Sequence, residues 1–112
     1  MNLKYLKYDK SFPVITTGKS LAYPESKSLL NYIEIIIREN PSKFAVNLEN
    51  VESIDSSGIS FLVKIAKSAR NRNIELILYG MSESLQRLFY AGGLDSFFKI
   101  FTKAEFQKIY NK

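Results

Sequence analysis

A short polar run, Asp55-Ser56-Ser57-Gly58, separates two apolar segments of this 112-residue chain. A serine hydroxyl beside a carboxylate suggests either nucleophilic catalysis or a site where a phosphate is added and removed. Catalysis by a serine nucleophile ordinarily needs a histidine base, and the chain contains no histidine. A lysine base is the remaining option and is poorly suited to the task, so we do not expect an enzyme.

The residues after this run predict that its serines lie at the start of a helix. Apolar residues recur there at helical spacing, namely Ile59, Leu62, Ile65, Ala66 and Ala69. The start of a helix offers unpaired N–H groups and the positive end of the helix dipole, so it tolerates a phosphate. The modified domain should therefore stay folded, while the added charge, next to Asp55, should repel an apolar or acidic partner surface. Gly58 is expected to leave room for close approach of another backbone.

A purely structural interpretation of the same run stays open. Asp55, Ser56 or Ser57 could simply cap the helix, which stabilises a protein by about 1 kcal/mol. On the outward face of that helix we expect Ser57, Phe61, Lys64 and Ser68. For Phe61 two alternatives remain, because the ring is either partly covered by a neighbouring helix or an aromatic anchor in a protein interface.

An alternation of strands and helices must position these residues. Strands are predicted at Leu3–Tyr8, Pro13–Thr17, Phe44–Leu48, Ile74–Tyr79 and Phe97–Phe101. Helices are predicted from Pro24 to before Pro41, from about Gly58 to Asn71, from Ser82 to Gly92, and after Thr102. The helix capped by Ser82 is expected to bury Leu85, Leu88 and Phe89.

The resulting order, β-β-α-β-α-β-α-β-α, predicts an α/β fold. The first two strands should form an antiparallel hairpin, and strands joined through helices should run parallel. We therefore expect a single domain with one mixed sheet, a parallel core, an antiparallel N-terminal strand and about four helices.

Composition excludes several classes of site and partner. The chain has no cysteine and no histidine, so thiolate and imidazole metal sites are impossible and no metal or cofactor is expected. The net charge is +5, but the basic residues are scattered apart from Lys64, Lys67, Arg70 and Arg72. A small basic nucleic-acid or nucleotide binder is thus the least favoured function. The longest strongly apolar stretch, Tyr32–Ile37, is too short to span a membrane, so we expect a cytoplasmic protein without membrane insertion.

Three stretches together resemble the STAS domains of anti-sigma-factor antagonists. They are NLENVESIDSSGISFLVK, IELILYG and SESLQRLFYAGGLDSFFKIF. The most specific pieces are the Asp-Ser-Ser-Gly run and the later block of Leu85 to Phe89 followed by Gly92-Gly93-Leu94. The resemblance covers nearly the whole chain, so residues 1–112 are expected to form one STAS domain.

The resemblance implies a partner-switching regulator that needs no cofactor of its own. Such antagonists bind an anti-sigma factor that is also a serine kinase, and the sigma factor, an indirect partner, is then released. The kinase phosphorylates the serine that matches Ser56, and a serine phosphatase restores the free hydroxyl. The implied partner-binding residues are Asp55, Ser56, Ser57, Gly58, Ser60, Phe61 and Lys64.

One loop departs from the family pattern. After the glycine of its second strand, the family often has a Leu-Asp pair, whereas this chain has Leu21-Ala22 and one extra residue. The difference is expected to alter partner contacts rather than the fold. A second function also stays open, in which the chain is a STAS subunit docked constitutively in a larger assembly, such as a lipid-transport ATPase complex or a stress-signalling scaffold, without modification of Ser56.

Overall fold

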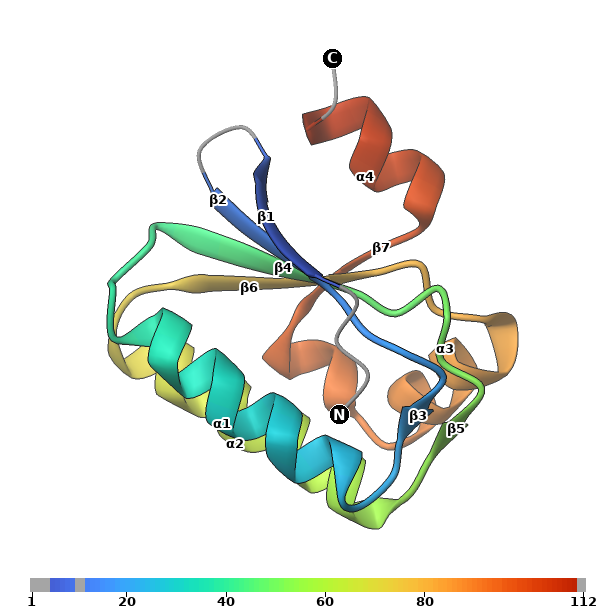
Figure 1. Cartoon of the computed structure of the whole chain (residues 1–112). Coiled ribbons are helices and arrows are strands. Elements are labelled where there is room, and N and C mark those ends of the chain that lie inside the picture. Colours follow the sequence, from blue (N-terminus) through green and yellow to red (C-terminus); the bar gives the residue numbers. More distant parts are fainter. Residues whose placement is uncertain (1–4, 10–11, 111–112) are drawn as a thin grey trace.

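The computed structural model describes residues 5–9, as backbone only, and residues 12–110. Within these residues the main sheet has the strand order β1-β2-β4-β6-β7 (Figure 1). The strands are β1 (Tyr5–Asp9), β2 (Phe12–Thr16), β4 (Lys43–Asn47), β6 (Glu75–Tyr79) and β7 (Lys99–Phe101). β1 pairs antiparallel with β2, and every other pairing in this sheet is parallel. The predicted mixed sheet with an N-terminal hairpin is confirmed.

Helices cover both faces of the sheet. They are α1 (Glu25–Ile37), α2 (Ser56–Asn71), α3 (Glu83–Ala91) and α4 (Lys103–Tyr110). α1 and α2 lie side by side against one face, whereas α4 packs on the opposite face (Figure 1). None of the helices in the described residues has the length and apolar character needed to cross a membrane.

Two apolar layers hold the helices to the sheet. Alternate residues of a strand point to opposite faces, so Phe44 and Val46 pack in the layer of α1 and α2 while Ala45 packs toward α4. On the α4 side, the rings of Phe106 and Tyr79 are stacked with centroids 3.8 Å apart. Burial on both faces explains why β6 has a mostly apolar sequence.

A second, very small sheet was not predicted. β3 (Ser20–Leu21) and β5 (Ser53–Ile54) pair in parallel, in segments expected to be loops. Strands of two residues are too short to show an alternating pattern, and only the tertiary fold brings these two together.

The end of the sheet also differs from prediction. Phe97 lies in the 3₁₀ helix η1 (Leu94–Phe97) rather than in the last strand, which begins at Lys99. Gly93, at φ +70°, turns the chain into η1, and the Ser96 hydroxyl donates to the Gly93 carbonyl at 3.1 Å. The predicted strand positions Leu3 and Lys4 lie outside the described residues.

Candidate functional site

Asp55 fixes the start of α2. Its Oδ1 accepts a hydrogen bond from the Gly58 N–H at 2.9 Å, the geometry of a helix N-cap. Its Oδ2 accepts from the Tyr23 N–H at 3.2 Å, in the loop that leads into α1. These bonds, first from Gly58 and then from Tyr23, lower the pKa of Asp55. The capping interpretation of the polar run is therefore correct for Asp55, and it leaves the neighbouring hydroxyls free for another role.

The serines of the run differ in exposure. Ser56, the first residue of α2, and Ser60, one turn later, are exposed, whereas Ser57 is half-buried. The Ser56 hydroxyl is thus presented at the positive end of the helix dipole. A side chain placed in this way is accessible to an enzyme that modifies it.

Gly58 lets another backbone approach closely, and that backbone belongs to the same chain. It is buried, and a Cβ at this position would overlap the Leu21 carbonyl oxygen and lie 2.8 Å from Ile54 Cγ1. The expected close approach of another backbone is confirmed, and that backbone is Leu21 in β3 of the same chain. The glycine lets the β3–β5 pair pack directly on the first turn of α2.

The outer face of α2 carries an aromatic ring paired with a cation. Phe61 is half-buried rather than fully exposed, so the domain itself covers part of the ring. The Nζ of Lys64, an exposed residue, lies 5.7 Å from the ring centroid. The predicted inward face is confirmed at Leu62, Ile65, Ala66 and Ala69, but Ile59 is only half-buried.

Two surface features beside the polar run were not predicted from the sequence. Tyr23 is 59% exposed, and its backbone is bonded to Asp55. A groove of about 250 Å³ lies between β5 and α3, and 44% of Leu88 is exposed at its edge. Leu88 was expected to face inward because its spacing matches that of Leu85, which is buried. Only the way α3 packs on the domain determines that Leu85 is buried and Leu88 is exposed. The exposure of Tyr23 could not be predicted, because Tyr23 belongs to no periodic pattern.

The loop that departs from the family pattern is held by local contacts. The Ser20 hydroxyl donates to Glu25 Oε1 at 3.2 Å and accepts from the Ala22 N–H at 3.1 Å. Residues 20 to 25 therefore form a defined surface next to Asp55. Among the described residues, no cluster of three or more His, Cys, Asp or Glu side chains could hold a metal ion.

Gly58→Ala should destabilise the domain. The added methyl group must displace β3 or α2, and overpacking of this kind costs about 1–3 kcal/mol. Urea unfolding measures the change. Gly92→Ala is the matched control, because a Cβ there would lie 3.4 Å from the nearest atom, the Leu88 carbonyl oxygen. Equal stability of the two variants would show that the close approach at Gly58 is not a constraint.

The stabilisation by Asp55 should depend on pH. Because folding lowers the pKa of this carboxyl, the ionised form stabilises the fold above the unfolded-state pKa of about 4, and this contribution is lost as the pH falls through the folded-state pKa. The difference in unfolding free energy between the wild type and Asp55→Ala should thus shrink as the pH falls below about 5. The pKa of Glu49 is also lowered, mainly by Lys103, but Glu49 is present in both proteins. A difference that stays constant with pH would contradict the role of the charge.

Comparisons with known proteins agree with this architecture. Residues 6–106 match the family model described as the STAS domain. The anti-sigma-B factor antagonist of Staphylococcus aureus (strain NCTC 8325 / PS 47) is 30% identical over 96 residues, which cover 84% of this chain and 86% of the relative.

Two solved structures share the fold. A Thermotoga maritima protein described as a candidate anti-sigma factor antagonist superposes with a TM-score of 0.83 at 22% identity, covering 96% of this chain and 94% of that one. The Bacillus antagonist SpoIIAA in its unphosphorylated form gives a TM-score of 0.72 at 18% identity, covering 94% and 93%. The family match spans nearly all of the chain, and the two solved structures share its fold. The chain belongs to the STAS domain family.

Proposed function

We propose that this protein is an anti-sigma factor antagonist whose binding is switched off by phosphorylation of Ser56. The observation that carries the proposal is the exposed Ser56 side chain at the first position of α2. The relatives named anti-sigma-B factor antagonists support the class of partner.

The geometry around Ser56 lets a phosphate change binding without unfolding the domain. Asp55 already caps α2, and the buried core lies elsewhere, so the fold does not depend on the Ser56 hydroxyl. A phosphate adds about −1.5 to −2 charges beside the Asp55 carboxylate. A partner that covers this surface would have to remove water from those charges, which is costly unless it supplies cations.

The neighbouring residues give a partner something to bind in the unmodified state. Tyr23 and the exposed part of Phe61 offer aromatic surface, and aromatic residues are enriched at the centres of interfaces. Lys64 and Ser60 add polar contacts on the next turn of α2. We therefore assign Asp55, Ser56, Ser57, Ser60, Phe61 and Lys64 to the partner surface, with Gly58 acting through the position of β3.

The partner is an anti-sigma factor with serine kinase activity, and its complex with the antagonist releases the sigma factor. In the switching step the Ser56 hydroxyl oxygen attacks the γ-phosphorus of the kinase's ATP, its proton is removed, and ADP leaves. A serine phosphatase hydrolyses the phosphoserine and restores the hydroxyl. In this cycle, which takes place in the cytoplasm, the antagonist is the substrate and the regulator and needs no cofactor of its own.

Ser56→Ala should abolish phosphorylation. When the protein is incubated with its kinase and ATP, intact mass spectrometry should show one added phosphate on the wild type and none on the variant. Ser57→Ala and Ser60→Ala serve as controls and should still gain the phosphate. Undiminished phosphorylation of Ser56→Ala would reject Ser56 as the acceptor.

Ser56→Asp should weaken the kinase complex without destabilising the antagonist. The expected loss of affinity is about tenfold or more, measured by calorimetry, with a urea midpoint close to that of the wild type. Ser42→Asp adds the same charge at an exposed site at the other end of the domain and should bind normally. If both variants and the phosphorylated protein bind as tightly as the wild type, the protein is a constitutive docking subunit instead.

A further inference from the structure

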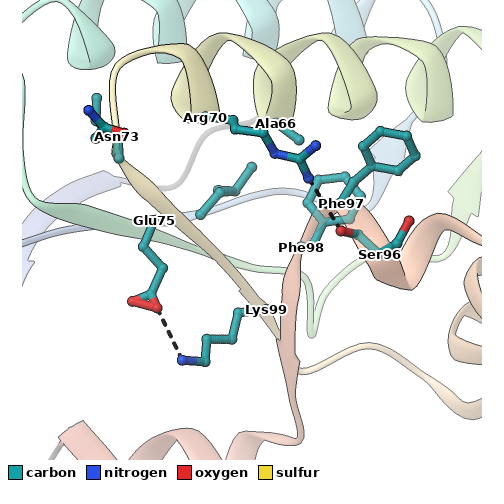
Figure 2. Close-up of a pocket in the computed structure, with 10 residues that line it drawn as sticks. Ala66, Arg70, Asn73, Glu75, Ser96, Phe97, Phe98 and Lys99 are labelled. Carbon is teal, nitrogen blue, oxygen red and sulfur yellow. Dashed lines mark hydrogen bonds and ion pairs between the residues drawn. The ribbon is translucent and has the colours of Figure 1, made fainter.

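A second cleft lies at the opposite end of α2 from Ser56. It has a volume of about 390 Å³ and is formed by α2, the start of β6, η1 and β7 (Figure 2). Arg70 at this end is fourteen residues from Ser56, which corresponds to roughly 21 Å along a helix. The cleft is therefore separate from the surface assigned to the anti-sigma factor.

The cleft displays cations that are held in place by an aromatic ring. Lys67 Nζ lies 6.0 Å and Arg70 Cζ 5.7 Å from the centroid of Phe97, which is half-buried. Arg70 Nη2 also donates to the Ser96 carbonyl oxygen at 3.3 Å, as Figure 2 shows. A guanidinium group has five N–H donors, so Arg70 is fixed in position and still able to donate to an anion.

The α2 side of the cleft is basic. Arg70 lines the cleft, and Lys67 lies beside it at the ring of Phe97. The other charged lining residues, Glu75 and Lys99, pair with each other at 3.2 Å and point away from Arg70 (Figure 2), so they do not neutralise it. The Ser56 surface does not account for this charge.

The floor of the cleft is apolar. Ala66 and Leu76 line it together with Ile74 and Phe98, and all four belong to the buried core cluster. The site thus combines a cationic rim with an apolar floor. Its ligand should carry negative charge next to an apolar group.

We propose that this cleft binds an acidic segment of a partner protein, with carboxylates on Arg70 and Lys67 and an apolar side chain in the hollow. A carboxylate matches the fork of a guanidinium group and can accept two hydrogen bonds from it. Single-stranded nucleic acid is a poorer match, because bases stack on free aromatic faces and the Phe97 ring is already half-buried and in contact with two cations. This surface works whether or not Ser56 carries a phosphate.

A short peptide tests the proposal on the whole protein. Acetyl-Glu-Glu-Leu-Glu-Glu-amide should bind at low ionic strength, as measured by calorimetry, and its NMR shift changes should centre on residues 66–76 and 96–99. Lys67→Glu/Arg70→Glu should weaken binding about tenfold or more. Lys27→Glu/Lys108→Glu changes the net charge equally at exposed sites on α1 and α4 and should bind like the wild type. Lys67→Gln/Arg70→Gln, with thermal unfolding recorded, checks that the loss is not due to misfolding.

Each other outcome contradicts part of the proposal. Equal losses in the two charge-reversed variants, or no binding at all, would show that the cleft is not a specific site. If a peptide with alanine in place of leucine binds as tightly as the leucine peptide, the apolar floor does not take part in recognition. If an oligonucleotide binds the same residues more tightly than the peptide does, the ligand of the cleft is nucleic acid and not an acidic protein segment. Ser56→Asp should bind the peptide normally, so failure here and failure of the Ser56 switch are distinguishable.

Discussion

The carboxylate of Asp55 joins two helix starts that are distant in the sequence. One oxygen caps α2 through Gly58, and the other holds the Tyr23 N–H, 32 residues earlier in the chain. The β3–β5 pair completes this junction, and it packs on α2 only because Gly58 has no side chain. The surface proposed to bind the anti-sigma factor is built around this junction, since Tyr23, Ser56 and Phe61 lie next to it.

The junction also explains how a regulatory site can be stable and still respond to modification. The residue that stabilises the helix start and the residue that is modified are neighbours, but they are different residues. Asp55 provides the cap, so the Ser56 side chain contributes little to folding and can gain a charge at small cost. Were Ser56 itself the cap, phosphorylation would alter the helix start as well as the partner surface.

Periodic patterns in the sequence were sufficient to predict the main helices and strands. Local patterns were not sufficient to predict which distant segments contact one another. The apolar spacing of Leu62 to Ala69 predicts α2, and Asp55, Ser56 and Ser57 are all residues that favour a helix cap, so the sequence predicts a cap without deciding which of the three forms it. The β3–β5 pair, the cover over Gly58 and the exposure of Leu88 depend on contacts between segments far apart in the chain. Gly58 shows the limit clearly, since a glycine predicts that something comes close but not what it is.

The C-terminal end of α2 likewise combines a feature visible in the sequence with a contact that only the fold brings about. Lys67, Arg70 and Arg72 are visible in the sequence as a basic cluster, and cations near a helix C-terminus are favourable simply because of the dipole. That explanation does not require Phe97, which arrives from a 3₁₀ helix some twenty-seven residues later and lies close to both Lys67 and Arg70. A ring that fixes two cations reduces the entropy lost when they bind an anion. The combination of helix end, ring and hollow therefore points to recognition, for which helix stability alone gives no reason.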